Sequence, residues 1–202
     1  MTHLSVNPKR IKSAIIELVA GSLEIGQIVV LPTDTVYGLS CLADDSRAIK
    51  KIYHLKKRDS NKPVLILVSD LKMAKKYTHI SRKQALLLGK LWAKKQVPTT
   101  VILHNRFKLP RELSLGSDGL AVRLPKSKFL IKIIEKAKCP IVSARLSFSG
   151  QKNITNLHRL HYYFPKKNNR PDLVIDAGPS PQKTPSRLID LRNEDEPLVL
   201  RK

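Results

Sequence analysis

The sequence has only two cysteines and no long apolar run, which excludes several classes of protein. Cys41 and Cys139 lie among apolar residues without a CxxC pair, so we expect neither a disulfide framework nor a thiolate metal site. Both thiols should be reduced and buried. No apolar stretch approaches the roughly 20 residues that cross a bilayer, and the first residues, MTHLSVNPKR, lack an apolar signal core. These features predict a cytoplasmic protein with no membrane contact.

Acidic and aromatic residues are also scarce. The 202 residues include 16 Asp and Glu against 38 Lys and Arg, which gives a formal net charge of +22. Such an excess attracts polyanions, of which RNA is the natural candidate, and a generally solvated basic surface is the alternative explanation. Because aromatic residues make up only 5% of the chain, a platform for stacking single-stranded bases is poorly supported, whereas contacts to phosphates remain open.

Apolar patterns along the chain predict alternating helices and strands. Asn7 and Pro8 are typical of a helix N-cap followed by the first helical residue. We expect helices over about 8–23, after the capping candidate Asp45, and over 71–95, 127–138 and 158–164. We expect strands over 27–31, 64–68, 99–103, 120–124, 140–143, 172–178 and 186–191.

This alternation indicates an α/β protein built on a twisted, open sheet with flanking helices. Several connections are too short for the crossovers between parallel strands, so the sheet should be mostly mixed. The length suits a single domain over residues 1–202, with its core over about 8–191 and a polar tail. Trp92 stands alone among lysines and is expected to anchor in the core.

A loop with the composition of a binding site follows the first expected strand. The segment PTDTVYG (32–38) combines two hydroxyls, a carboxylate, a tyrosine and a glycine at a strand exit, where open α/β sheets bind ligands. Asp34 is a candidate general base. The alternative is a rigid turn in which Thr33 and Asp34 only cap backbone groups.

A second motif, KKRDSNKP (56–63), is strongly basic and lies between a helix and the strand at 64–68. It brings Lys56, Arg58 and Lys62 to the helix C-terminus, where the helix dipole favours cations in any case. The functional interpretation is a clamp for phosphates. The chain contains neither GxxxxGK[ST] nor GxGxxG, which argues against a P-loop or a dinucleotide-binding site.

Taken in order, six segments resemble the YrdC/Sua5/TsaC family of threonylcarbamoyl-AMP synthases. They are VVLPTDTVYGL, IYHLKKRDSNKPVLILV, TTVIL, LAVRLP, PIVSARLSFSG and TPSRLIDL. The resemblance covers roughly residues 10 to 191, and its most specific part is PTDTVYGL followed at a fixed distance by K-x-R-x-x-x-K-P. It implies a YrdC-like fold in the short, single-domain form, without the C-terminal extension of longer Sua5 proteins.

The resemblance also implies a reaction. Threonine and bicarbonate form a carbamate that attacks the α-phosphorus of ATP, which releases pyrophosphate and leaves threonylcarbamoyl-AMP. Mg²⁺ accompanies the nucleotide as a substrate ion, and partner proteins then transfer the threonylcarbamoyl group to adenosine 37 of tRNA. Such a displacement depends on positioning and charge neutralisation more than on a protein nucleophile.

Individual residues take their expected roles from the matched motifs. Lys56 and Arg58 match the family's K-x-R pair and would be the catalytic residues that hold the triphosphate. Arg123 would receive the threonine carboxylate as an ion pair, and Thr33 and Thr35 would help to place the amino acid or the nucleotide. The resemblance assigns the ATP site to Lys56, Arg58, Lys62, Ser143, Arg145, Ser147 and Ser186.

Two motifs depart from the family pattern. Aligned without gaps, PIVSARLSFSG of this chain matches PLVSTSANxSG of the family, so Arg145 replaces a serine and Ser147 replaces an asparagine. A shifted alignment keeps the serine, but it needs a two-residue insertion and still loses the asparagine. TPSRLID stands against PSTVVD, so Ser186 is kept and Arg187 replaces a threonine. Because a guanidinium cannot accept a hydrogen bond, the phosphate pocket should be more cationic or partly filled.

These departures leave hypotheses of different classes open. The chain is either a working synthase with a more basic pocket, or a non-catalytic protein of the same fold that binds tRNA or double-stranded RNA, with the charge of +22 in its favour. A third hypothesis is a carbamoyl-adenylating module that acts on another acceptor. The first hypothesis requires threonine as the acceptor, the second predicts binding without turnover, and the third predicts turnover with another acceptor.

We expect no metal site of the protein's own. His158 and His161 are three residues apart on the expected helix over 158–164, a spacing that two metal ligands can have. No third ligand is evident from the sequence beside them. The pair is therefore not expected to bind a metal.

Overall fold

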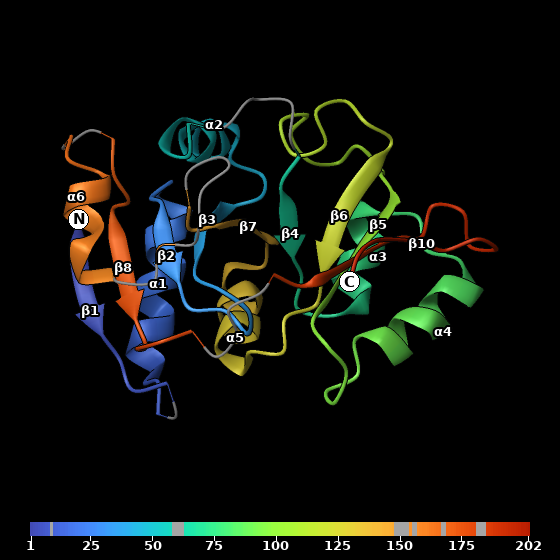
Figure 1. The fold of residues 1–202 in the computed structure, drawn as a ribbon, viewed down its shortest axis with the longest axis horizontal. Helices are drawn as coiled ribbons and strands as arrows, with labels where there is room; N and C mark the ends of the chain where they lie inside the picture. The colour runs from blue at the N-terminus through green and yellow to red at the C-terminus, as the bar shows by residue number, and fades with distance from the viewer. Residues whose placement is uncertain (9, 58–62, 148–153, 155–156, 167–168, 181–184) are drawn as a thin grey trace.

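The computed structural model describes residues 1–8, 10–57, 63–147, 154, 157–166, 169–180 and 185–202 (Figure 1). Its strands form one ten-stranded sheet in the order β1-β8-β2-β3-β7-β4-β6-β5-β9-β10. The strands are β1 (Thr2–Ser5), β2 (Val29–Leu31), β3 (Gly38–Leu42), β4 (Leu65–Leu67), β5 (Thr99–His104), β6 (Gly119–Arg123), β7 (Ile141–Arg145), β8 (Leu173–Asp176), β9 (Arg187–Asp190) and β10 (Leu198–Arg201).

Strand pairing in this sheet is mixed. β1 and β2 both run parallel to β8, β4 runs parallel to β6, and β5 runs parallel to β9. The pairs β2/β3, β3/β7, β4/β7, β5/β6 and β9/β10 are antiparallel. The expected α/β fold with a mixed open sheet and flanking helices is confirmed.

Two apolar cores lie on opposite faces of the sheet. Val29 and Leu31 of β2 pack with Leu23 and Ile133 on one face, whereas Val30, between them, joins the core on the other face. Successive strand residues point to opposite faces, so a strand covered on both sides is apolar throughout. The helices are α1 (Ser13–Glu24), α2 (Ser46–Leu55), α3 (Leu71–Tyr77), α4 (Arg82–Leu91), α5 (Lys128–Ala137), the 3-10 helix η1 (Leu157–Arg159) and α6 (Leu160–Tyr163).

Side-chain caps explain where four of these helices begin. Each cap accepts a hydrogen bond from the backbone N–H three residues later and stabilises its helix by about 1 kcal/mol. These residues are Asp45, Asp70, Ser81 and Ser127. Ser81 also forms a capping box with Gln84, so a new helix starts there. The single helical region expected over 71–95 is therefore two helices, α3 and α4.

The first helix begins later than the sequence suggests. Lys12 is the N-cap residue of α1, so the expected cap at Asn7 is wrong; the carbonyl of Asn7 instead accepts the N–H of Arg10 in a turn at 3.0 Å. Residues 2–5, which precede this turn, form β1 at one end of the sheet. At the other end, β10 lies in the region expected as a polar tail, and its four side chains are exposed.

Two smaller expectations, for the cysteines and for Trp92, are confirmed. Cys41 and Cys139 are buried and form no disulfide. Trp92 is buried in the core, and its Nε1 donates to the carbonyl of Thr99 at 3.1 Å. In the part of the chain that the structure describes, no helix has the length and apolarity needed to cross a membrane.

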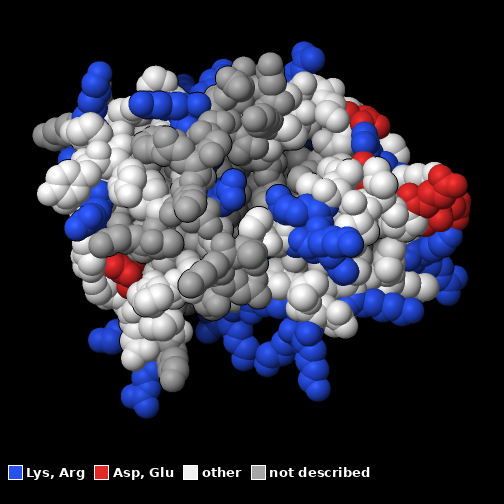
Figure 2. Space-filling model, in the orientation of Figure 1, with Lys and Arg blue, Asp and Glu red and all other residues white. Residues whose placement is uncertain are grey.

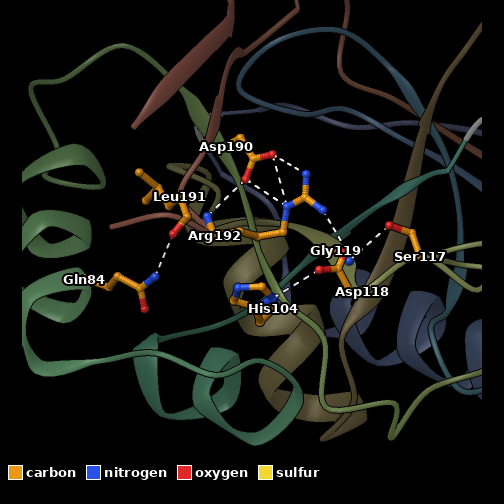
Figure 3. Close-up of polar contacts among 8 residues, drawn as sticks. All are labelled: Gln84, His104, Ser117, Asp118, Gly119, Asp190, Leu191 and Arg192. Atoms are coloured by element: carbon orange, nitrogen blue, oxygen red, sulfur yellow. Dashed lines mark hydrogen bonds and ion pairs between the residues drawn. The ribbon is translucent and has the colours of Figure 1, made fainter. Parts of the chain in front are cut away.

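A polar network holds the end of β9 against its neighbours (Figure 3). Arg192 donates through Nη2 to Asp190 and through Nη1 to Asp118, each at 2.6 Å. Gln84 of α4 donates to the carbonyl of Leu191 at 2.7 Å. Because Asp118 precedes β6 and Asp190 ends β9, this one guanidinium joins two strands that flank β5.

Candidate active site

A cavity of about 290 Å³ lies where the PTDTVYG loop meets the ends of several strands. Three arginines that end strands, Arg123 of β6, Arg145 of β7 and Arg201 of β10, all contribute to its wall. Ligands of open α/β sheets bind at such strand ends. Of the residues expected in the site, this cavity brings together Thr35, Arg123, Ser143, Arg145 and Ser186.

The two threonines of the PTDTVYG loop have different roles. The Thr33 hydroxyl donates to the carbonyl of Val36 at 2.7 Å and accepts the N–H of Thr35 at 3.0 Å, so it builds the turn. With its own proton committed, it accepts from the Thr35 hydroxyl at 2.9 Å. The Thr35 oxygen in turn accepts from Nη1 of Arg123 at 3.1 Å. Thr35 therefore reaches the cavity, whereas Thr33 lines a second cavity of about 420 Å³ behind the loop.

Arg123 and Asp34 form a buried ion pair at the base of the site. Nη2 of Arg123 donates to Oδ1 of Asp34 at 2.6 Å, and the arginine is 3% exposed. Burial lowers the pKa of Arg123, and the adjacent Asp34 carboxylate acts in the opposite direction. In the described part of the chain, Nε of Arg123 and Oδ2 of Asp34 have no hydrogen-bond partner. Buried polar atoms without partners are rare, so these two mark the pair as an unusual feature of the site.

Asp34 is thus neither a simple turn cap nor an isolated base. The turn is capped by Thr33, and the Asp34 carboxylate is held by Arg123. Its partial burial, at 12% side-chain exposure, makes the pair with Arg123 the main compensation for its charge. Asp34 therefore fixes the guanidinium that faces the cavity.

Arg201 is a site residue that the sequence patterns did not reveal. Its Nε donates to the carbonyl of Ser186 at 2.8 Å, which fixes the guanidinium beside the cavity. Although Arg201 is partly exposed, the partial burial of its guanidinium, together with the positive charges of Arg145 and Arg123, lowers the pKa of Arg201. In the described residues neither Arg145 nor Arg201 has an ion pair with a carboxylate. Figure 2 shows Lys and Arg side chains gathered around the C-terminal end, in the middle of this face.

Small side chains supply hydroxyl groups and space in the same cavity. Ser186 is buried and shares a hydrogen bond of 2.7 Å with the hydroxyl of Thr100. Ser143 of β7 pairs with β3 beside Gly38, where a Cβ atom would lie only 2.7 Å from the Ser143 hydroxyl oxygen. The glycine of PTDTVYG therefore leaves room for the Ser143 hydroxyl.

Tyr37 joins the same loop to the segment after β8. Its hydroxyl accepts the N–H of Ala177 at 2.9 Å and donates to the carbonyl of Gly178 at 2.7 Å. Burial, aided by the charge of Asp176, raises the pKa of Tyr37 to about 12. Tyr37 therefore stays protonated at neutral pH and keeps both bonds while it lines the cavity.

The expected phosphate clamp is only partly described. Lys56 ends α2 as its C-cap and is 3% exposed, and its Nζ donates to the carbonyls of Arg145 and Ser147, the latter at 2.6 Å. It thus fastens the chain just after β7 and is not part of the cavity wall. Ser147 is buried and also does not line the cavity. Arg58 and Lys62 lie outside the described residues.

Comparisons with known proteins agree with this architecture. A family model for Sua5, YciO and YrdC proteins, described as telomere recombination, matches residues 21–202. The chain belongs to this family. It is 31% identical over 194 residues to the threonylcarbamoyl-AMP synthase of Pyrococcus abyssi, which covers 96% of this chain and 55% of that protein. The family resemblance that the motifs carry is therefore confirmed.

Solved structures of family members have the same fold. Sua5 of P. abyssi complexed with L-threonine superposes with a TM-score of 0.87 at 29% identity and covers 100% of this chain and 57% of that one. YciO of E. coli superposes with a TM-score of 0.85 at 21% identity and covers 100% of this chain and 96% of that one. The chain spans about half the length of several of the curated relatives that it matches.

Proposed function

We propose that the protein synthesises threonylcarbamoyl-AMP from threonine, bicarbonate and ATP, for the modification of adenosine 37 in tRNA. Support comes from its Sua5/YciO/YrdC family, from relatives named threonylcarbamoyl-AMP synthase, and from a relative solved with L-threonine. The observation that carries the proposal is the cavity with three arginines at strand ends, because all three substrates are anions or carry carboxylate groups.

Arg123 is the proposed receptor of the threonine carboxylate. Its guanidinium is oriented by Asp34 and Thr35 and lies in the wall of the cavity. A guanidinium that is already fixed loses little conformational entropy when it binds a carboxylate. Thr33 contributes indirectly, because it holds the turn that presents Thr35.

The triphosphate is proposed to lie against Arg145 and Arg201. In the reaction an oxygen of the threonine carbamate forms a bond to the α-phosphorus, the bond from that phosphorus to the bridging oxygen breaks, and pyrophosphate leaves with its electron pair. Fixed cations stabilise the charge that moves onto the leaving group. Mg²⁺ is expected on the phosphates as part of the substrate.

The departures from the family motifs fit a working but more basic site. Arg145, in place of a serine, adds a positive charge to the wall of the cavity, and Ser143 and Ser186 keep their hydroxyl groups there. Lys56 is proposed to position Arg145, since its ammonium group donates to the carbonyl of that residue. The contributions proposed for Arg58, Lys62 and Ser147 to the ATP site rest on the resemblance.

The wider role is also a proposal. Transfer of the threonylcarbamoyl group needs partner proteins and tRNA, and a net charge of +22 supports binding of the tRNA backbone. Work on ATP and tRNA would take place in the cytoplasm. The single sheet that runs from β1 to β10 supports one YrdC-like domain over residues 1–202.

The test is pyrophosphate release by the purified protein with ATP, Mg²⁺, threonine and bicarbonate, each omitted in turn. Release should require every component. Arg123→Ala should reduce it by about 100-fold or more, whereas Arg82→Ala, which removes an exposed arginine on α4 away from the cavity, should leave it unchanged.

Two other outcomes would change the conclusion. Release that continues without threonine would favour a module that uses another acceptor. If no pyrophosphate is released with all substrates present, and the protein binds double-stranded RNA or tRNA in a salt-sensitive way, the synthase is contradicted. That result would favour a nucleic-acid-binding protein of this fold.

A further inference from the structure

Two histidines and a carboxylate from three separate segments meet at one end of the sheet. His3 lies on β1, His158 lies on η1, and Asp176 ends β8. β1 and β8 are paired in parallel, and Figure 1 shows them side by side near the N-terminus. One potential ligand atom of each of the three residues lies within 4.8 Å of the other two. The separation along the chain hides this cluster from any local motif.

The Asp176 carboxylate is oriented toward both histidines. Its Oδ1 accepts the N–H of Gly178 at 2.8 Å, and its Oδ2 lies 3.1 Å from Nε2 of His3 and 3.8 Å from Nε2 of His158. In a tetrahedral zinc site with bonds of about 2.0–2.1 Å, neighbouring ligand atoms are about 3.4 Å apart. The distance from Asp176 to His3 is slightly shorter than this value and that to His158 is slightly longer, so small movements would bring the three atoms to the spacing of a zinc site.

The three candidate ligands differ in their exposure. The side chains of His3 and Asp176 are 26% and 11% exposed, whereas that of His158 is 77% exposed. The two imidazole rings stack with centroids 5.1 Å apart and planes within 2°. An ion must lie close to the plane of each ring that binds it, so the His158 ring has to turn about χ2. This torsion is broad for histidine, and the exposed ring has room for the rotation.

A simpler role accounts for only part of the cluster. The pair between His3 and Asp176 can hold β1 to β8 without any ion. It does not involve His158, whose Nε2 lies 3.8 Å from the same carboxylate oxygen and whose ring stacks on that of His3. His161, which the sequence spacing offers as a partner of His158, donates instead to the carbonyl of His158 at 3.1 Å.

We propose that His3, His158 and Asp176 bind a divalent transition-metal ion of the Zn²⁺ class. Two imidazole nitrogens and one carboxylate oxygen suit Zn²⁺, Co²⁺ or Ni²⁺, whereas Mg²⁺ and Ca²⁺ prefer oxygen ligands alone. A water molecule completes the tetrahedron. The sequence alone predicts no metal site, and this site is separate from the Mg²⁺ that accompanies ATP.

The proposed ion links the edge of the sheet to the candidate active site. It joins β1 and η1 to the end of β8, and the next two residues after Asp176, Ala177 and Gly178, hold the Tyr37 hydroxyl. Tyr37 lines the cavity with the three arginines. The ion therefore stabilises the backbone that positions one wall of that cavity.

The test is calorimetric titration of the full chain, without a histidine tag and stripped with chelator, with ZnCl₂. We expect one ion per chain and a rise in melting temperature on saturation. His158→Ala should weaken Zn²⁺ binding by about tenfold or more and remove the thermal shift. His161→Ala removes an exposed histidine of the neighbouring helix α6 and should bind like the wild type.

A second variant separates metal binding from folding. His3→Gln keeps a donor near Asp176 but removes a metal ligand, so it should retain its fold by circular dichroism and lose affinity for Zn²⁺. Bound Co²⁺ should give the intense visible absorption of tetrahedral coordination. The proposal is overturned if the wild type binds no Zn²⁺, or if folded His158→Ala and His3→Gln bind it as tightly as His161→Ala.

Discussion

Arg192, at the end of β9, and the arginines of the cavity have opposite electrostatic surroundings. Arg192 lies between Asp190 and Asp118, and the hydrogen bonds that it donates to those two carboxylates raise its pKa (Figure 3). Arg123 and Arg201 lie at the cavity, where burial, and for Arg201 also the neighbouring arginines, lowers the pKa. All remain charged at neutral pH, because an arginine in a protein does not lose its proton.

The difference separates a structural role from a binding role. Around Arg192 the chain supplies the negative charge itself, so the network is complete without a ligand. Around the cavity it supplies three cations and, in the described residues, the single paired carboxylate of Asp34. An anionic ligand would relieve the repulsion between like charges. The comparison predicts that variants of the two groups lose different properties.

The largest expected effect is that of Arg123→Ala. It should reduce pyrophosphate release by about 100-fold or more, because the receptor of the threonine carboxylate is lost. It also leaves the buried Asp34 without its partner and should lower the free energy of unfolding by about 3–5 kcal/mol. Initial rates and urea unfolding measure the two effects.

Arg123→Lys distinguishes charge from geometry. It restores a positive charge near Asp34 but lacks the planar fork, so it should recover stability more than activity. Equal recovery of both would contradict a directional role for the guanidinium.

A smaller, purely functional loss is expected for Arg201→Ala. The KM for ATP should rise by about tenfold or more as a charge-assisted contact is lost. The melting temperature should change little, because the positive charge of Arg201 is unfavourable beside Arg145 and Arg123. The matched control is Lys202→Ala, which removes the next, exposed cation. A KM that rises equally in both variants would remove Arg201 from the site.

The opposite result is expected for Arg192→Ala. Its partners are partly exposed, with Asp118 at 58%, so solvent screening limits the loss of unfolding free energy to about 1–2 kcal/mol. Pyrophosphate release per folded molecule should match the wild type. Lost activity in a fully stable Arg192→Ala protein would contradict the assignment of this network to structure alone.

The smallest expected effect concerns how steeply the free energy of unfolding falls with pH in the acid range. Burial acts to raise the pKa of Asp190, but the hydrogen bonds from Arg192 outweigh it, and the pKa is lowered. A carboxyl with a lowered pKa contributes stability above its unfolded pKa of about 4, and this is lost as the pH falls through the folded pKa. Urea unfolding from about pH 5 to pH 3 should show a steeper decline in the wild type than in Asp190→Asn. Parallel curves would contradict the role of this carboxylate.

Much of the fold can be predicted from the sequence because buried strands have continuous apolar runs. VLILV contains β4, and DLVIDAG contains β8, since both faces of the sheet are covered. β3 escapes prediction because Gly38 and Ser40 interrupt its apolar pattern. β10 escapes because all its side chains are exposed, so its apolar residues indicate no buried face. Pairing across the sheet, rather than local preference, defines these strands.

The site residues that belong to local sequence motifs could be predicted, whereas those brought to the site by the packing of distant segments could not. PTDTVYG, Arg123, Ser143, Arg145 and Ser186 are recognisable from local patterns and lie together. The sequence does not reveal that Arg201 reaches the same cavity, because that depends on β10 pairing with β9. Nor does it show that Lys56 points at main-chain carbonyls, since burial of its ammonium group follows from packing.

The most direct test of the central claim is detection of threonylcarbamoyl-AMP itself by mass spectrometry. The protein is incubated with ATP, Mg²⁺, threonine and bicarbonate, and Arg82→Ala and Arg123→Ala serve as matched variants. We expect the product with the wild type and Arg82→Ala, about 100-fold less of it or none with Arg123→Ala, and isotope incorporation from labelled bicarbonate. Absence of the product with folded wild-type protein that still binds pyrophosphate would contradict the synthase and leave an anion-binding site without this chemistry.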